Sequence, residues 1–329
     1  MPSLCVSETS RVDALFIGTA FLDIVFAELD GPPAAGREVW AAKRIFSPGG
    51  MANNAIGAAR LGLHSALVTA IGEDSCGDLL WAALEGEPGL DLSWARRVRG
   101  IETALTVAVS DDLDRSLISH GLLDPLNVAE ITRTLPFATT SFASLHPEPV
   151  EWLALLRRAG SVVFAGVGWD KRHGWSQDMI SQLSDVDVFV ANEEEALAYT
   201  RASSVQDALR RLGEHVALVV VTLGGRGVIA LDTATGLEVS VDAVPGPVRD
   251  TTGAGDEFVA GLMYATTVAS LPLVDRLRFA ALCSGLAVRG WGGSASAPTL
   301  AVINSWSRSA EPRPHGYAFL DELLTASTI

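Results

Sequence analysis

DTTGAGDEF, residues 250–258, is the stretch around which the rest of this chain can be ordered. The apolar residues that follow, from Phe258 to Met263, recur at helical spacing and predict a helix that begins near Gly255. Residues 253–255 carry almost no side chain, so the backbone can turn tightly there. Backbone N–H groups at a helix start point the same way, and together with the helix dipole they favour a bound anion.

Asp256 stands at the edge of this predicted anion site. The helix dipole favours a carboxylate in a first turn, which is a purely structural reason for an aspartate at this position. A carboxylate beside an anion site is also suited to take a proton from a hydroxyl group while the N–H groups stabilise phosphate charge. Spacing alone leaves both interpretations open.

Length and composition indicate a globular protein with a large core. The chain has 329 residues, 48% of them hydrophobic, which suffices for one large or two ordinary domains. No apolar run approaches the ~20 residues that span a bilayer, and residues 1–13 show no secretory signal. Cys5, Cys76 and Cys283 form no CxxC pair, so we expect neither zinc nor disulfides, and a cytoplasmic location.

The net charge of −15 argues against nucleic acid as a partner, because contacts to a phosphate backbone need clustered Lys and Arg. A single nucleotide is compatible with this charge, because its phosphates need only a local nest of N–H groups and a cation. We therefore expect a small-molecule partner, with neither nucleic acid nor membrane involved.

Strands and helices alternate along most of the chain. Short apolar runs typical of buried strands occupy residues 14–18, 66–71, 162–165, 186–190 and 217–221. This rhythm predicts an α/β fold: a doubly wound, mostly parallel central sheet with helices on both faces. Residues 22–46 and 107–118 depart from the rhythm, because the first segment reads as two strands and the second as a hairpin.

Polar and glycine-rich segments follow several of these strands. Asp23 comes soon after the first strand, at the sheet edge where open α/β proteins bind ligands, although a turn residue is its alternative reading. Gly49 and Gly50 open a small-residue helix, where backbone can approach a ligand and Asn53 or Asn54 can bond a hydroxyl. By composition alone, this helix could equally pack closely on the sheet.

Two later segments are compatible with a nucleotide. The strand at 186–190 leads into Asn192 and three glutamates at 193–195, which are commonly just dipole partners on a solvated face. The strand at 217–221 runs into TLGGRG at 222–227. A glycine turn between strands lets backbone approach phosphates, and it is also what an ordinary hairpin requires.

In their order and spacing, these segments resemble the ribokinase-type carbohydrate kinases, also called the phosphofructokinase B family, over about residues 14–303. Residues 250–256 are similar to the family signature DTxGAGD, and residues 49–62 to its GGxxxN helix that ends in RLG. Residues 192–195 look like its NxxE motif and residues 222–227 like its TLGxxG motif.

The resemblance implies a single ribokinase-like domain over residues 1–329, with a small β-sheet lid from about 22–47 and 101–120. It also implies an enzyme that transfers the γ-phosphate of ATP to a hydroxyl of a sugar or sugar-like molecule. Exposed edges of lid strands often pair between subunits, so we expect a homodimer through the lid.

The resemblance also implies roles for individual residues. Asp256 would be the base that activates the acceptor hydroxyl, and Gly253, Ala254 and Gly255 would form the anion hole. Contacts to the acceptor would come from Asp23, Gly49, Gly50 and Asn53. Contacts to ATP would come from Asn192, Glu195, Thr222, Gly224 and Gly227. Glu195 would orient Mg²⁺ through water, and Asp250 would help to hold a monovalent cation such as K⁺, as in some members.

This chain departs from the family pattern at the acceptor. One residue is missing after Gly50, so counting forward selects Asn54, whereas counting back from RLG selects Asn53, which we prefer because the helix then matches without a gap. Ribokinase has an Asn and a Lys where this chain has Phe21 and Met51. Ribose is therefore not the expected acceptor, and a larger or partly apolar one such as a nucleoside is favoured, unless both are core residues.

Two alternatives to a sugar kinase stay open at this point. One is a nucleoside or vitamin kinase on the same fold. The other is a catalytically silent relative that binds a ligand and acts as a regulator, because a fold does not fix a function. The presence of Asp256, its glycines and Glu195 favours an active enzyme.

Overall fold

The computed structural model describes residues 4–110, 115–121, 128–148, 150–168, 174–268, 270–309 and 315–326. A large sheet has the strand order β15-β14-β13-β12-β11-β10-β1-β4-β6. Its strands are β1 (Cys5–Ile17), β4 (Ser65–Val68), β6 (Leu90–Asp91), β10 (Thr134–Ser144), β11 (Val162–Gly166), β12 (Val188–Asn192), β13 (Leu218–Thr222), β14 (Val228–Asp232) and β15 (Leu237–Val241). Neighbours from β13 to β6 pair in parallel, and only β14 runs antiparallel to both its partners.

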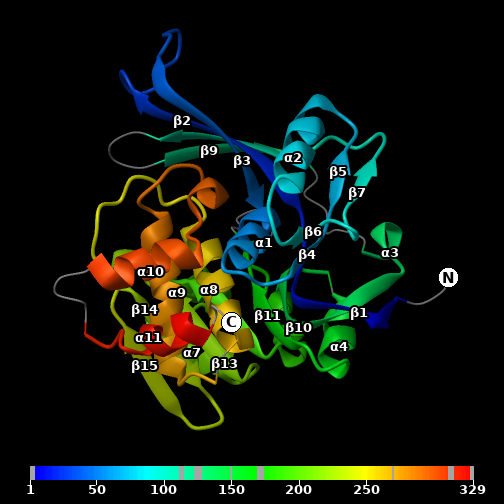
Figure 1. The fold of residues 1–329 in the computed structure, drawn as a ribbon, viewed down its shortest axis with the longest axis vertical. Helices are drawn as coiled ribbons and strands as arrows, with labels where there is room; N and C mark the ends of the chain where they lie inside the picture. The colour runs from blue at the N-terminus through cyan, green and yellow to red at the C-terminus, as the bar shows by residue number, and fades with distance from the viewer. Residues whose placement is uncertain are drawn as a thin grey trace.

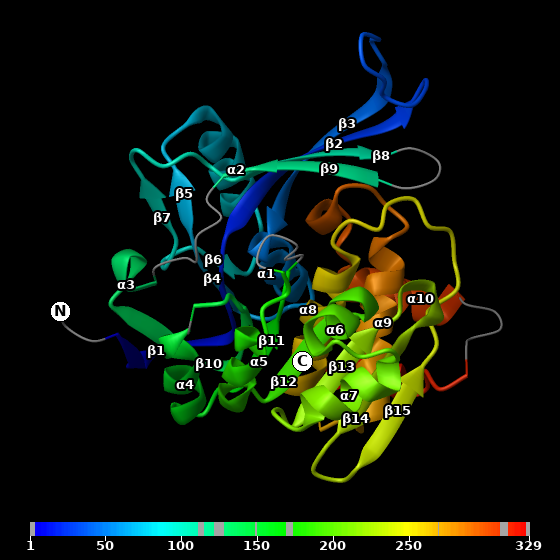
Figure 2. The ribbon, with the colours of Figure 1, turned by 180° about the vertical axis from the view of Figure 1, so that it is seen from behind.

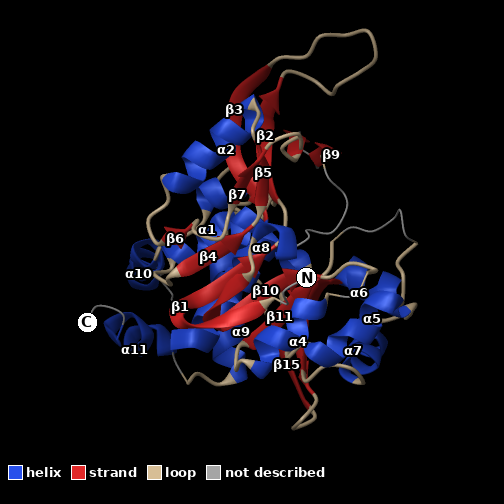
Figure 3. Cartoon of the chain, turned by 90° about the vertical axis from the view of Figure 1, so that its right-hand side faces the viewer, coloured by secondary structure: helices blue, strands red, loops and turns tan. Residues whose placement is uncertain are grey.

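Helices cover both faces of this sheet (Figures 1 and 3). One face packs against α1 (Met51–Arg60), α2 (Ser75–Glu85), α8 (Ala254–Val268), α9 (Leu273–Ala287), α10 (Leu300–Ser309) and α11 (Phe319–Ala326). The other packs against α3 (Val128–Ile131), α4 (Glu151–Arg158), α5 (Asp178–Ser181), α6 (Glu193–Thr200) and α7 (Val205–Gly213). None of these helices, within the described ranges, is long and apolar enough to cross a bilayer.

Alternating side chains along the strands create the two cores. In β1, Phe16 belongs to the core under α1 and α8, whereas its neighbours Leu15 and Ile17 belong to the core under α4 to α7. Successive side chains of a strand point to opposite faces, so an almost continuous apolar run supplies both layers. The predicted doubly wound, mostly parallel α/β sheet is confirmed.

The strand predicted at 66–71 is wrong as a single element. It is broken at Thr69 into β4 and β5 (Ala70–Gly72), and β5 pairs with β7 (Arg96–Val98) in a separate two-stranded sheet. The buried Thr69 hydroxyl accepts the Ala20 N–H at 3.1 Å, which ties the break to the start of β2 (Ala20–Leu29). A run of apolar residues does not reveal such a change of sheet.

A separate four-stranded sheet, the lid sheet, has the order β3-β2-β8-β9. Its strands are β2 (Ala20–Leu29), β3 (Ala41–Gly50), β8 (Leu105–Ser110) and β9 (Arg115–His120). The predicted small β-sheet is therefore confirmed, although residues 111–114 of its hairpin lie outside the described residues. Strands β2 and β3 continue beyond β8 and β9 as an arm that extends from the body (Figures 1 and 2).

The two faces of the lid sheet differ in character. The face that carries Ile45 and Ser47 lies against Gly292, since a Cβ on that glycine would come within 2.9 Å of Ile45 and 3.6 Å of Ser47. We call this the inner face. The outer face carries a row of apolar residues in register across all four strands: Phe46, Ile24, Val107 and Ile118.

Candidate active site

The predicted base stands in the first turn of α8, which begins at Ala254 as the sequence predicted. The chain enters this helix through Gly253, whose φ of +73° is in the left-handed region and whose absent Cβ would lie 2.9 Å from Gly293. Both observations require glycine at this position. The Ala254 N–H donates to the Thr251 carbonyl at 3.2 Å, and the half-buried Asp256 follows.

Both asparagines of α1 hold Asp256. Asn53 Nδ2 donates to Asp256 Oδ2 at 2.8 Å, and Asn54 Nδ2 donates to the Asp256 main-chain carbonyl at 3.1 Å. Asn53 Oδ1 in turn accepts the Ser294 N–H at 2.9 Å. Sequence reasoning selected Asn53 for the acceptor and did not anticipate these bonds to the predicted base.

The residues predicted to bind the acceptor lie together at the base of the lid sheet. A Cβ on Gly49 would lie 2.1 Å from the Asp23 carboxylate, so that close approach is possible only with glycine. Gly50 lies against the Phe21 ring in the same way. Met51 is a buried core residue that contacts Gly18, which removes the reason to place it against an acceptor.

A row of polar residues crosses the inner face of the lid sheet on either side of Asp23. Asp23 pairs with Ser47 on one side and Thr106 on the other, and Thr106 pairs with Ser119. The Thr106 and Ser119 hydroxyl oxygens lie 3.1 Å apart. The sequence analysis identified Asp23 but not the other residues of this row. Each predicted lid strand carries a polar residue at the corresponding position, and this pattern could have revealed the row.

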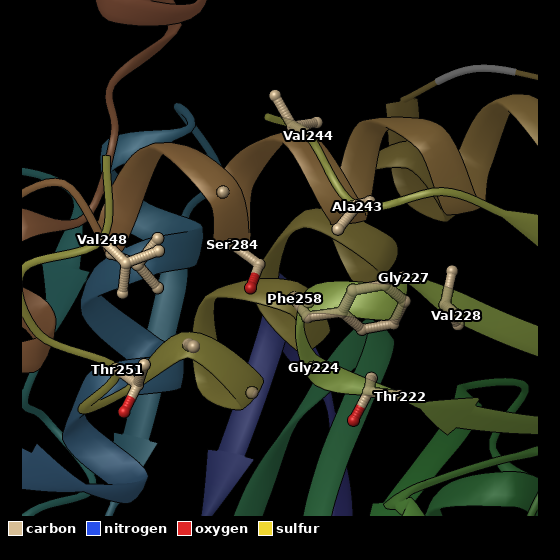
Figure 4. A pocket seen from close by; sticks show the side chains of 16 residues that line it. Thr222, Gly224, Gly227, Val228, Ala243, Val244, Val248, Thr251, Phe258 and Ser284 are labelled. Atoms are coloured by element: carbon tan, nitrogen blue, oxygen red, sulfur yellow. The ribbon is translucent and has the colours of Figure 1, made fainter. Parts of the chain in front are cut away.

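Three of the five residues predicted to bind ATP meet the start of α8 around one cavity of about 230 Å³ (Figure 4). Thr222, Gly224 and Gly227 line it from the turn between β13 and β14, and Ala254 and Gly255 line it from α8. Its remaining walls were missed, because they come from apolar residues without a motif: Val228, Ala243, Val244, Val248, Phe258, Ala281, Ser284, Gly285 and Val288, with Thr251 and Gly225.

The NxxE motif lies beside this cavity. Asn192 pairs with Thr222 across β12 and β13, and an ion pair between Glu193 and Arg226 joins the two motifs. Asn192 caps α6: its Oδ1 accepts the Glu195 N–H at 2.8 Å, and Glu195 Oε2 accepts the Asn192 N–H at 2.9 Å. This reciprocal capping box fixes where the Glu195 carboxylate lies.

Negative charge accumulates where the predicted ATP residues and the predicted base meet. Burial raises the pKa of Glu195 to about 7, and the charges of Asp256 and Glu194 add to the effect. The charge of Asp256 thus acts on Glu195 although the two residues are far apart in sequence. Carboxylate oxygens under such repulsion fit a hard divalent cation, which would relieve it.

Asp250 fastens two loops. Its Oδ1 accepts the Thr252 N–H and its Oδ2 accepts the Gly292 N–H, both at 2.8 Å, and the side chain is buried. It therefore joins the turn before α8 to the loop at 290–296. The predicted potassium site would have to share this carboxylate with two N–H donors.

Glu257 was not singled out in the sequence. Its side chain is 1% exposed and presses on Gly57 of α1, and neither carboxyl oxygen has a hydrogen-bond partner among the described residues. Burial raises the pKa of Glu257 well above its ordinary value, and the charge of Asp256 adds to this shift.

The comparisons with known proteins agree with this geometry. A sequence profile of the pfkB family carbohydrate kinases matches residues 14–300. This chain belongs to the pfkB family of carbohydrate kinases. Relatives of this carbohydrate kinase include 5-dehydro-2-deoxygluconokinase of Bacillus anthracis, 24% identical over 94% of this chain and 99% of that protein. Fructokinase-1 of Zea mays is 28% identical over 79% of this chain and 88% of that protein.

Solved structures support the fold of this pfkB kinase. The ribokinase of Arabidopsis thaliana, complexed with ribose and ATP, superposes with a TM-score of 0.73 at 22% identity, over 91% of this chain and all of that one. The ribokinase of Thermotoga maritima gives a TM-score of 0.72 at 20% identity, with 91% and 100% covered. The predicted family, fold and enzyme class are thus confirmed.

Proposed function

We propose that this kinase transfers the γ-phosphate of ATP to a hydroxyl of a sugar, with Asp256 as the general base. The observation that carries the proposal is that Asp256 directly follows Ala254 and Gly255, which line the cavity, and is held at 2.8 Å by Asn53 of α1, the helix that begins after Gly49 and Gly50. Asp256 takes the hydroxyl proton as the oxygen attacks phosphorus. The N–H groups of residues 253–255 stabilise the charge on the phosphoryl oxygens.

ATP and Mg²⁺ are the proposed cofactors. The Arabidopsis thaliana ribokinase was solved in complex with ATP, which supports ATP as the donor here. Mg²⁺ would neutralise the phosphates, and Glu195 would orient it through its water shell. Burial, with the charges of Asp256 and Glu194, raises the pKa of Glu195, and a cation nearby would favour its charged form. Potassium beside Asp250 stays a prediction, and potassium dependence of turnover is the measurement that decides it.

A polyhydroxy acceptor suits the lid sheet better than a nucleoside. Asp23, Thr106 and Ser119 offer a carboxylate and two hydroxyls in one row, and a sugar carries matching groups along its chain. The relatives named for 5-dehydro-2-deoxygluconate and fructose support this class. Phe21 alone supports a stacked base, since Met51 is buried in the core.

The test is ATP consumption with Mg²⁺ across sugars, sugar acids and nucleosides, with Asp256→Asn in parallel. We expect turnover on a sugar that falls by roughly 10²–10⁴-fold in Asp256→Asn, as for the loss of a general base, while ATP binding persists. An Asp256→Asn protein as active as the native one would refute the assignment of the base. The homodimer through the lid, the cytoplasmic location and the lack of a nucleic-acid partner remain predictions beside this proposal.

A further inference from the structure

A buried chain of hydrogen bonds joins the proposed base to the lid sheet. Asp256 Oδ2 accepts from Asn53 Nδ2 at 2.8 Å, and Asn53 Oδ1 accepts from the Ser294 N–H at 2.9 Å. The Ser294 hydroxyl donates to the Pro48 carbonyl at 2.7 Å and lies 3.0 Å from the Ser47 hydroxyl. Ser47 and Pro48 belong to β3, so the chain of bonds ends inside the lid sheet.

Apart from the half-buried Asp256, the members of this chain are shielded from water. Asn53 is 3% exposed, and Ser294 and Ser47 are each 1% exposed. A buried polar group that loses its partner cannot replace it with water, so the loss of one hydrogen bond in such a chain weakens the others. The backbone N–H of Ser294 can only donate, which fixes the Asn53 amide with its Nδ2 toward the Asp256 carboxylate.

The far end of the chain lies beside the proposed acceptor contact. Ser47 is the residue of β3 that pairs with Asp23 of β2, and Asp23 lies against Gly49 two residues along β3. A displacement of the lid sheet from the loop at 290–296 moves Ser47 and Pro48 away from Ser294. The same displacement would carry Asp23, which pairs with Ser47, away from the body.

We propose that Asn53 and Ser294 are positioning residues that align the Asp256 carboxylate for proton transfer when the lid sheet is seated on the body. This inference rests on the proposed role of Asp256 as the base. Asn53 stabilises the charged carboxylate by donating to it and sets its direction. Ser294 makes that alignment depend on the lid sheet, so the base is ready when an acceptor is enclosed, which limits ATP hydrolysis by water.

Ser294→Ala tests the link to the lid sheet, because it keeps the N–H that binds Asn53 and removes the hydroxyl that binds Pro48. We expect kcat to fall about tenfold, as for the loss of a buried hydrogen bond, with the KM for ATP unchanged. ATP hydrolysis without acceptor should become a larger share of total turnover. Ser296→Ala is the matched control, since Ser296 lies in the same loop and its hydroxyl donates to the Trp291 carbonyl at 2.8 Å.

Asn53→Asp and Asn53→Ala test the link to the base through the pH profile. A second carboxylate beside Asp256 should move the acid limb of kcat/KM for the sugar up by about one pH unit or more, since like charges raise a pKa. Asn53→Ala, which only removes a donor to the charged form, should move the same limb less. A purely structural role would lower activity in both variants without this ordered shift.

A double variant of Ser47→Ala with Ser294→Ala gives a further check, because members of one chain should not have additive effects on kcat. The inference is overturned if Ser294→Ala matches the Ser296→Ala control in kcat and in acceptor-free hydrolysis, or if the Asn53 variants keep the native acid limb. That failure is distinct from failure of the proposed function. If this inference alone fails, Asp256→Asn still loses its activity. If the proposed function fails, Asp256→Asn retains turnover.

Discussion

Glu257 and its neighbour Asp256 both contact α1, at residues that lie one helical turn apart. Asp256 accepts from Asn53, whereas Glu257 presses on Gly57 without a hydrogen-bond partner among the described residues. Because burial raises its pKa, this carboxyl stays protonated in the folded chain at pH values where the unfolded chain, with a pKa of 4.5, is ionised. Its contribution to stability is therefore complete below pH 4.5 and is lost as pH rises toward the folded pKa.

We predict that Glu257→Gln flattens this pH dependence. As pH rises, loss of the Glu257 proton should lower the free energy of unfolding of the native protein by up to about 1.4 kcal/mol per pH unit, the value for one proton. The variant should lack this contribution to the slope. Urea unfolding between pH 5 and 8 measures it, with the exposed Glu214→Gln as control. Equal slopes for the native protein and Glu257→Gln would contradict the prediction.

Glu195 gives a second prediction at the scale of a residue. Its pKa of about 7 means that it gains a proton as pH falls below neutral, and a neutral carboxyl orients Mg²⁺ poorly. The Mg²⁺ concentration for half-maximal turnover should therefore rise as pH falls from 8 to 6 in the native enzyme. Glu195→Gln should need more Mg²⁺ at every pH and lose this dependence. A native requirement that is constant with pH would count against Glu195 as the group that orients the ion.

At the scale of an element, the lid strands test the acceptor class. Thr106→Val removes one hydroxyl from the inner face with little change in volume, so the KM for the sugar acceptor should rise about tenfold, as for a lost hydrogen bond. The KM for ATP should not change. Ser116→Ala is the control, since Ser116 pairs with Val109 on the outer face of the same sheet. Unchanged sugar kinetics in Thr106→Val would exclude this row from the acceptor site.

At the scale of the whole molecule, the outer face of the lid sheet is the surface that suits a second copy. Ile118 is 70% exposed and Phe46 44%, and they flank Ile24 and Val107 in one row. Burial of such an apolar row between two lid sheets would favour a homodimer. Ile118→Lys should then give monomers by light scattering. Leu237→Lys on β15, at an equally apolar site with 52% exposure, should leave the mass unchanged.

Local sequence predicted the elements and the motifs, and it failed where distant residues meet. The turn at Gly253, the lid segments and the ATP motifs each depend on a few neighbouring residues, so they could be predicted from the sequence. Ser294 reaches Asn53 across 241 positions, and nothing in its own neighbourhood marks it. Glu257 was not singled out, because its burial against Gly57 depends on α1, which is distant in sequence.

The order of strands in the large sheet has a consequence for how this protein is made. Strand β1 of this sheet pairs with β10, and the whole lid sheet lies between them in the sequence. A growing chain can join β1 only to β4 until Thr134 and the residues after it have been synthesised. Pairings so distant along the chain close late and slow folding. One side of β1 thus stays uncovered during much of synthesis, when the chain is most prone to associate with others.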